Sequence, residues 1–282
     1  MTLEYISPKG DIMPLTGSQY FTLTEIDGFT VAQSEISSVV IPFVDGDTIT
    51  NQQTNPRTII LYFKLKRDIG IENAKRYILR FVKLKQQGRI HLVQNGRDIE
   101  LSGTVEAVDL PRFGEGCTMA VTLHCSQPYW EDVDFVVREI SQILNLHYFP
   151  IEEGGLAFPT AGVPFGSYDT DLTQELENEG DVETGMIINI IALGEVVNPK
   201  IINTYTGEYI GVNDTLEGND SVVITTVKGQ KSITKNGINI INKIMTGSTF
   251  LQLVTGANEY TIQADSGIDD VYFTLTYKRL YI

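Results

Sequence analysis

The sequence predicts a mostly β fold in two domains, namely an N-terminal α+β sheet or barrel with one packed helix and a C-terminal antiparallel β-sandwich. From 198 to 282, short runs rich in Ile, Val, Thr and Tyr recur every eight to twelve residues between Gly-containing turns, a spacing typical of a sandwich. Earlier in the chain, candidate strands show apolar and polar residues in alternation. Only 71–86 has convincing helical periodicity.

The overall composition is that of a globular protein. Of the 282 residues, 42% are hydrophobic, near the globular norm, and no run of about 18 apolar residues suggests a membrane span. The first residues lack the basic start and apolar core of a signal peptide, so we expect the chain to be made in a cytoplasm. The net charge of −15 argues against a general nucleic-acid binder, which needs basic patches.

Charge is unevenly distributed along the chain. Between Arg57 and Arg97 lie eleven Lys or Arg and only two acidic residues, Asp68 and Glu72, whereas the range 131–195 holds fourteen acids and one base. Patches of opposite sign can steer neighbouring copies of a chain together. Two solvated faces that merely differ in charge would produce the same pattern.

Three strands are expected before the helix, at 20–26, 36–43 and 57–67. In the third, residues such as Ile59 and Leu61 alternate with Thr58 and Tyr62, which gives one apolar face and one face that becomes basic at its end. Prolines at 42 and 56 stand near strand ends, where a missing N–H does least harm.

The predicted helix at 71–86 places apolar residues on one side and ends near Gly88, a common stop signal. Its opposite side is basic. Such a face can bind nucleic acid or an anionic membrane, but it is more often simply exposed to water. The basic residues are Lys75, Arg76, Arg80 and Lys83.

A β-hairpin follows the helix. The strand 89–94 meets Asn95-Gly96, a strong signal for a type I′ turn, and the chain returns over 98–109, with a further strand at 118–126. The last strand region contains both cysteines, Cys117 and Cys125. An extended chain would hold them about 26 Å apart, too far for a disulfide, so we interpret both as reduced thiols.

The segment from 127 to about 180 differs in character, being rich in Gly, Pro and aromatic residues. Its prolines exclude a continuous helix or central strand, and we interpret it as a long connection packed by aromatic side chains. Within it, 135–146 can be a short helix or the extended first strand of the next domain. We therefore expect domains at 1–130 and 181–282, with 131–180 as linker and entry. The residues in question are Pro150, Pro159, Pro164, Tyr148, Phe149, Phe158 and Phe165.

The sequence contains no signature of an enzyme, metal site or cofactor site. Its histidines lack ligand spacing such as His-x-x-x-His, and no Gly-x-Ser-x-Gly or phosphate-binding glycine loop occurs. Adjacent acids in Gly-rich loops more often solvate a turn than hydrolyse a glycoside, and the acids around Gly218 depart from EF-hand spacing. We interpret His91 and His124 as core or cross-strand residues. The other groups considered are His147, Glu131–Asp132, Glu152–Glu153, Asp269–Asp270, Asp214, Glu217 and Asp220.

Several longer segments form a recognisable set. The N-terminal half contains NPRTIILYFKL, the helix after it, NGRDIELSGTVEAVDLPRF and LHCSQPYWED, and the C-terminal half contains NEGDVETGMIINIIALGEVVNPKI, TGEYIGVNDTL, VKGQKSITKNGINII and STFLQLVTGANEYTI. Over nearly the whole chain, this set resembles the distal tail proteins of bacteriophages. Members of that family commonly close the first domain with an aromatic Pro-Tyr element, here Pro128, Tyr129 and Trp130.

The resemblance implies a structural protein of the virion tail tip. In that family the N-terminal domain forms a hexameric ring, and the C-terminal domain is a galectin-like, carbohydrate-binding-module-like sandwich that projects outward. The ring joins the tail tube protein to the tail-associated hub protein and, in many phages, to receptor-binding proteins. It implies no enzymatic activity, no cofactor and no membrane, and DNA only as cargo passing through the ring.

Charge and motif position suggest where copies would meet. The residues chosen for the oligomer interface are Arg57, Lys64, Lys66, Arg97, Tyr129 and Trp130. An alternative function is direct recognition of host cell-wall carbohydrate, since galectin-like sandwiches stack an aromatic ring on the sugar. Its candidates are also ordinary strand residues, because aromatics favour pleated surfaces. They are Tyr205, Tyr209 and Tyr260.

Overall fold

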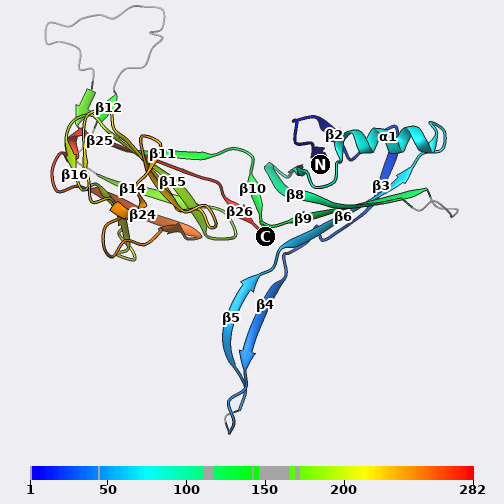
Figure 1. Cartoon of the computed structure of the whole chain (residues 1–282), viewed down its shortest axis with the longest axis horizontal. Coiled ribbons are helices and arrows are strands. Elements are labelled where there is room, and N and C mark those ends of the chain that lie inside the picture. The colour runs from blue at the N-terminus through cyan, green and yellow to red at the C-terminus, as the bar shows by residue number, and fades with distance from the viewer. Residues whose placement is uncertain (1, 44, 111–116, 142, 146–165, 169–171) are drawn as a thin grey trace, which may run out of the picture. The chain divides into compact units, whose positions relative to one another are not determined.

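The computed structural model describes residues 2–43, 45–110, 117–141, 143–145, 166–168 and 172–282 (Figure 1). The chain divides into two compact units. Unit 1 comprises Met1–Val133 together with Leu280–Ile282, and unit 2 comprises Asp134–Arg279. Across the described residues, no helix combines the length and apolar character that crossing a membrane requires.

Unit 1 is built on one antiparallel sheet whose strands follow the order β2-β1-β7-β8-β9-β6-β3. A short strand, β10, pairs with β8 and with β26, the last strand of the chain. The strands are β1 (Thr2–Ile6), β2 (Ile12–Pro14), β3 (Phe21–Asp27), β6 (Arg57–Leu65), β7 (Gln87–Gln94), β8 (Arg97–Asp109), β9 (Thr118–Cys125), β10 (Trp130–Asp132) and β26 (Leu280–Tyr281).

The alternation in β6 produces the predicted apolar face. Ile59, Leu61 and Phe63 are fully buried, while the residues between them are exposed or half-buried. Helix α1 (Ile71–Phe81) covers the core through Ala74 and Ile78. One face of the sheet and the apolar side of the helix therefore form the core of unit 1.

The helix is shorter than the sequence predicts, because it ends at Phe81 rather than near residue 86. Val82 is already extended and is buried in the core, and the backbone N–H of Lys85 donates to Val105 on β8. Lys85 adopts a positive φ of 63°, the turn role that we assigned to Gly88. The long-range bond to β8 and the burial of Val82 outweigh the helical periodicity.

The Asn95-Gly96 turn is confirmed. Both residues have positive φ, 53° and 80°, as a type I′ turn requires, and β7 and β8 pair from Gln94↔Arg97 to Gln87↔Thr104. Cys117, which precedes β9, and Cys125 are both free thiols. Burial raises the pKa of Cys125 to about 11, so this thiol stays protonated.

Strands β4 (Ser34–Val39) and β5 (Thr48–Thr54) form a two-stranded sheet of their own, which stands apart from the rest of unit 1 in Figure 1. We call residues 30–56 the hairpin. The strand predicted at 36–43 ends at Val39, because the chain turns at Pro42 and Phe43. None of the described hairpin residues belongs to the core of unit 1.

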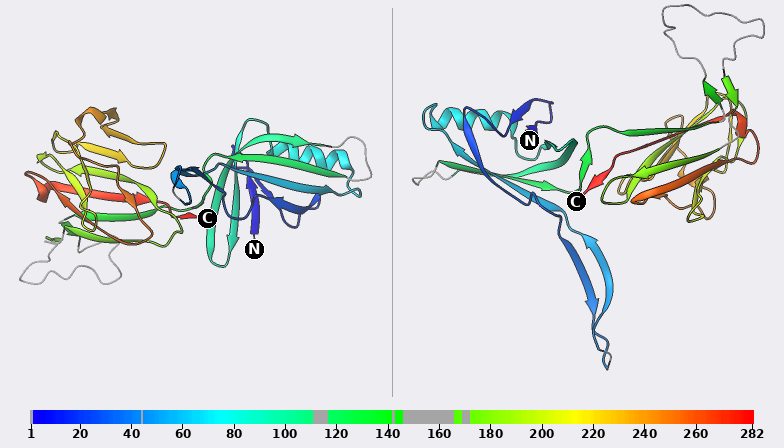
Figure 2. Two further views of the ribbon diagram at one scale, coloured as in Figure 1. Left: turned by 90° about the horizontal axis from the view of Figure 1, so that it is seen from below. Right: turned by 180° about the vertical axis from the view of Figure 1, so that it is seen from behind.

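Unit 2 contains two larger antiparallel sheets that share one hydrophobic core (Figure 2). One sheet has the order β11-β25-β15-β20-β21-β22, with β23 paired to β15, and the other has the order β14-β24-β17-β18. Their strands are β11 (Val136–Ser141), β14 (Thr173–Asn178), β15 (Thr184–Ala192), β17 (Lys200–Asn203), β18 (Tyr209–Gly211), β20 (Ser221–Thr225), β21 (Ser232–Lys235), β22 (Ile238–Asn239), β23 (Gln252–Leu253), β24 (Gly256–Gln263) and β25 (Val271–Tyr277).

Smaller elements complete unit 2. Two further strand pairs occur, and two short 3₁₀ helices precede β23 and β25. They are β12 (Ile143–Asn145) with β13 (Gly166–Tyr168), β16 (Val196–Val197) with β19 (Thr215–Leu216), η1 (Ile241–Lys243) and η2 (Ile268–Asp270).

The range 135–146, for which the sequence left helix and strand open, is extended where it is described. Val136–Ser141 pairs with β25 along its whole length. The range expected as linker and entry, 131–180, thus contains β11 and β14 of unit 2. The predictions for the aromatic and Pro residues at 148–165, for His147 and for Glu152–Glu153 lie outside the described residues.

Candidate functional site

The hairpin is the part of unit 1 that exposes the most apolar side chains. A hydrophobic side chain in water is normal when isolated, whereas a contiguous group marks an interaction surface. Here the exposed side chains follow one another toward the tip of the hairpin, and no described residue of the hairpin belongs to the core of unit 1. They are Val31, Ile36, Val39, Val40, Ile41, Phe43 and Ile49.

Phe43 stands out within this group. Its side chain is fully exposed and its backbone has a φ of 67°, a region that bulky residues rarely adopt. Such a conformation costs on the order of 1–3 kcal/mol and is concentrated at functional positions. Neither burial within its own unit nor a favourable backbone explains a phenylalanine at this position.

The six residues chosen for the oligomer interface have different environments. Arg57 and Trp130 are buried inside unit 1, 5% and 3% exposed, and Trp130 packs edge-on against Phe29 with ring centroids 5.1 Å apart. Lys64 is exposed, and Lys66 is half-buried with its Nζ donating to the carbonyl of Ser18 at 2.8 Å. Only the residues at the surface can contact another chain directly.

Arg97 is exposed and Tyr129 is half-buried, and the two lie in different segments of unit 1. The Arg97 guanidinium is 5.0 Å from the ring centroid of Tyr281 in β26. The Tyr129 hydroxyl is 2.8 Å from the hydroxyl of Thr54, which ties the base of the hairpin to the body of unit 1. The hairpin is therefore anchored at its base, although its tip is exposed.

The guanidinium of Arg57 lies at the end of the apolar face of β6, across from Cys125. Among the described residues, none accepts a hydrogen bond from any of its three nitrogens. Burial lowers the pKa of Arg57. The sequence could not reveal this burial, because arginine at a strand end is usually exposed.

The three tyrosines proposed for carbohydrate binding do not form one platform. Tyr260 is fully buried, its hydroxyl donates to the Gln252 carbonyl at 3.2 Å, and burial raises its pKa to about 12. It is a core residue and cannot stack on a sugar. Tyr209 donates to the Thr246 carbonyl at 2.6 Å and carries Lys200 over its ring, which leaves only Tyr205 well exposed.

A row of ionisable side chains crosses four strands of unit 1, and sequence reasoning did not find it. Glu4, His91, Glu100 and Glu131 are directly paired across β1, β7, β8 and β10. Their side chains share the face of the sheet opposite the core. Four segments far apart in sequence supply them, so only the strand register could bring them together.

His91 is the centre of this row. Its Nε2 lies 2.6 Å from the Asp98 carboxylate and its Nδ1 lies 3.4 Å from the Glu4 carboxylate. Burial favours the neutral ring, but the hydrogen bonds with Asp98 and Glu4 outweigh it and raise the pKa of His91. The expectation that His91 is a cross-strand residue is confirmed, and His124 lies exposed on β9.

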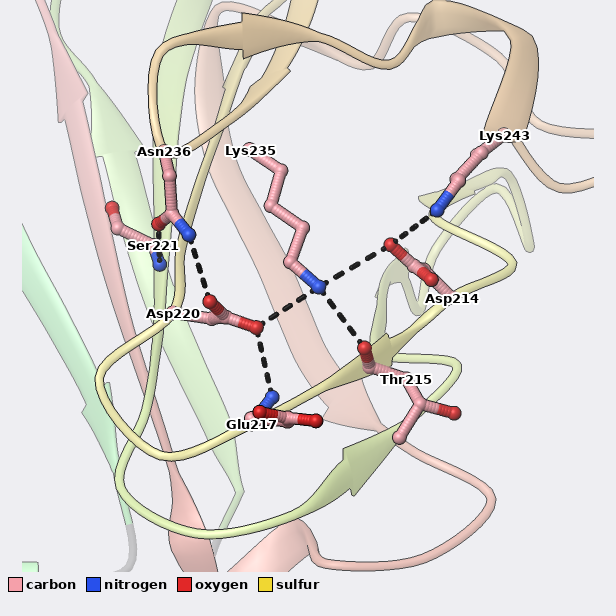
Figure 3. Close-up of polar contacts among 8 residues, drawn as sticks. All are labelled: Asp214, Thr215, Glu217, Asp220, Ser221, Lys235, Asn236 and Lys243. Atoms are coloured by element: carbon pink, nitrogen blue, oxygen red, sulfur yellow. Dashed lines mark hydrogen bonds and ion pairs between the residues drawn. The ribbon is translucent and has the colours of Figure 1, made fainter.

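The acids around Gly218 belong to an ionic network in unit 2 (Figure 3). The Lys235 ammonium lies 2.9 Å from Asp220 and 3.5 Å from Asp214, and it donates to the Thr215 carbonyl at 3.0 Å. Lys243 binds Asp214 from the other side at 2.9 Å. The Lys235 ammonium thus lies between the carboxylates of Asp214 and Asp220.

The pKa values of this network follow from its contacts. A hydrogen bond from the Glu217 backbone N–H, then those from Lys235 and Asn236, lower the pKa of Asp220 to about 2. Burial opposes ionisation of Asp214, but its lysine contacts lower its pKa. In the parts of the chain that the structure describes, no group of three or more His, Cys, Asp or Glu is placed to hold a metal ion. The network is a structural clamp.

Comparisons with known proteins identify this architecture. Residues 179–281 match the family "Siphovirus-type tail component, C-terminal domain". Among solved structures, the fold is similar to the Dit protein (gp 19.1) of SPP1, described as a paradigm of the hub adsorption apparatus in phages that infect Gram-positive hosts. That similarity has a TM-score of 0.68 at 14% identity and covers 100% of both chains.

Weaker similarities are to chains of the phage P2 baseplate in its activated conformation. The structure with Ca gives a TM-score of 0.48 at 9% identity and covers 98% of each chain. The structure with Sr gives 0.46 at 8% identity and covers 98% of this chain and 97% of that one. Similarity at this level supports no argument. No curated protein matches the sequence significantly.

The expected resemblance is thus confirmed by a family match in the C-terminal third and a shared fold over the full chain. The C-terminal part of the chain, residues 179–281, is therefore similar to siphovirus-type tail components, and the chain as a whole shares the fold of the SPP1 Dit protein.

Proposed function

We propose that this protein forms a hexameric ring that connects the tail tube to the tail hub and the adhesion apparatus. Unit 1, which corresponds closely to the expected 1–130 domain, would form the ring. The observation that carries this proposal is the hairpin, which extends from unit 1 and exposes a row of apolar side chains.

The energetics of the hairpin support self-association. An isolated two-stranded hairpin is at best marginally stable in water, and burying each Val, Ile or Phe side chain contributes about 1.5–3 kcal/mol. The exposed side chains of β4 and β5 gain this stabilisation only from a second surface. Identical copies of the chain supply such a surface, and a head-to-tail contact closes into a ring when its rotation fits.

Unit 2 would be the outward lobe, with a galectin-like, carbohydrate-binding-module-like sandwich. Two antiparallel sheets around one core support this reading. By sequence the lobe holds 8 Lys or Arg and 20 Asp or Glu, a formal charge of −12, against 13 and 16, or −3, in unit 1. Like charge keeps such lobes apart on a ring, which leaves them accessible to hub or receptor-binding proteins. DNA would pass through the ring only as cargo.

Part of this acidity is concentrated on the edge strand β14. Glu175 stands directly opposite Glu259 of β24, and like charges in that position destabilise a sheet. A basic partner surface would relieve the repulsion. We therefore propose that the adhesion apparatus presents basic residues to this edge.

Native mass spectrometry and light scattering of the purified full chain test the ring. We expect a hexamer or two stacked hexamers, with closed rings visible by negative-stain electron microscopy. A strict monomer at the highest attainable concentration, in the presence of the tail tube protein as well as alone, would contradict ring formation.

A further inference from the structure

We infer that Phe43, at the tip of the hairpin, inserts into a pocket of the neighbouring copy beside the edge strand β3. This inference rests on the proposed ring and identifies the surface of the neighbouring copy that receives the hairpin tip. The pocket lies at the start of β3 in unit 1. Its lining residues are Leu15, Thr16, Gly17, Ser18, Phe21, Thr22, Leu23 and Lys66.

The hairpin tip has the properties of a docking residue. Phe43 is fully exposed, holds a positive φ of 67° and follows Pro42, whose own φ is restricted. Val39, Val40 and Ile41 before it are also exposed. A strained aromatic residue whose side chain is fully exposed in its own chain is explained when a second chain receives it.

The pocket has the size and lining for an aromatic ring. Its volume is about 380 Å³, and a cavity of about 150 Å³ lined by apolar side chains already holds benzene. Phe21 at its wall is 4.8 Å from Phe63 in an edge-on arrangement. A further ring beside Phe21 would extend this aromatic packing, which prefers edge-on or offset geometry.

The charges of the two surfaces are complementary. Residues 30–56 contain no Lys or Arg, and Asp45 and Asp47 follow the tip directly. Lys66 lines the pocket, and Lys64 is exposed on β6 across from Thr22. Opposite charges around an apolar contact set its orientation and speed its formation.

Tip and pocket lie toward opposite ends of one pair of strands. The hairpin leaves β3 and β6 at the end marked by Asp27↔Ile60, whereas the pocket lies at the end marked by Phe21↔Leu65. A seven-residue strand separates these ends by roughly 23 Å, and the hairpin extends away from the sheet (Figure 1). A copy therefore offers the tip to one neighbour and the pocket to the other. This is a heterologous contact, the kind that closes into rings.

Complementation between two variants tests this arrangement. Phe43→Ser removes the tip, and Thr22→Trp blocks the pocket at an exposed position that leaves the core intact. We expect each variant alone to be monomeric, with association at least tenfold weaker than in the native chain. Their equimolar mixture should give 1:1 dimers and no rings, because only one productive contact remains. Ile36→Ser, exposed midway along the hairpin, should weaken association less.

A photo-crosslinking phenylalanine analogue at position 43 of the full chain gives an independent readout. Mixing isotopically light and heavy protein should yield crosslinks between copies that map to 15–23, whereas the analogue at Val31 should not reach that segment. Rings with crosslinks elsewhere, or rings formed by Thr22→Trp, would overturn the assigned pocket and leave the ring proposal standing. Absence of both rings and intermolecular crosslinks would overturn both.

Discussion

At the residue scale, His91 couples the outer face of unit 1 to pH. A neutral imidazole donates through one nitrogen only, yet both nitrogens of His91 face carboxylates, those of Asp98 and Glu4. The protonated ring satisfies both. Glu100, paired with His91 on β8 and bound to Arg89 at 2.8 Å, adds negative charge to the same face.

Because the folded pKa of His91 is raised above its ordinary value of 6.5, protonation of His91 stabilises the folded chain. This stabilisation is complete below pH 6.5 and is lost as pH rises through the folded pKa. We expect unit 1 to unfold at lower urea concentration as pH increases over that window. His91→Gln should remove this dependence, and His124→Gln, on the exposed face of β9, should retain it.

Arg57 is a residue whose removal should stabilise the protein. Its buried guanidinium nitrogens have no hydrogen-bond acceptor among the described residues, and each buried unsatisfied group costs about 1–3 kcal/mol. Arg57→Met keeps the apolar stem and removes the charge. Urea unfolding should show a free energy of unfolding higher by about 1–3 kcal/mol.

Arg76→Met is the matched control for Arg57→Met. The Arg76 side chain is 76% exposed, and its ion pair with Glu72 is long, with 3.8 Å between Nε and the carboxylate oxygen. We expect its change in unfolding free energy to stay within about 0.5 kcal/mol, as for most surface substitutions. A destabilised Arg57→Met would mean that the guanidinium has an acceptor in solution.

At the element scale, the hairpin separates assembly from folding. None of its described residues contributes to the core, and the bond between Thr54 and Tyr129 joins it to the sheet. Replacing residues 31–54 with a short Gly-Ser linker should change the unfolding free energy by about 1 kcal/mol, the value of one hydrogen bond. The same replacement should abolish rings in native mass spectrometry.

Shortening the β7–β8 turn region would serve poorly as a control, because that hairpin belongs to the central sheet. Removing the exposed turn residues 228–230 between β20 and β21 is a better control, since it alters a loop of similar exposure in unit 2. Rings should persist in that variant. Loss of rings in both would indicate a general effect of loop removal.

At the scale of the whole molecule, unit 1 includes Leu280–Ile282, which follow unit 2 in the sequence. Tyr281 is 5% exposed, pairs with Trp130, and donates from its hydroxyl to Asp132 at 3.0 Å. Truncating a buried aromatic residue costs about 3–5 kcal/mol. In calorimetry, Tyr281→Ala should lower the melting temperature of the transition of unit 1 and leave that of unit 2 unchanged. Ile282→Ala, half-exposed, should shift neither strongly.

Local sequence determined the elements whose cause is local. Alternation over 57–65 specified both faces of β6, Asn95-Gly96 specified a turn with two positive φ angles, and periodic Gly turns specified the strands of unit 2. These follow from the two-residue period of a strand and from backbone sterics.

Only the tertiary structure decided which of these elements share a surface. It ended helix α1 at Phe81 by burying Val82, placed Arg57 and Tyr260 inside, and assembled the row around His91 from four strands. It also placed the described residues of the hairpin outside the core of unit 1, although their sequence resembles that of any other strand. Burial and register depend on contacts between distant segments, and no local pattern contains that information.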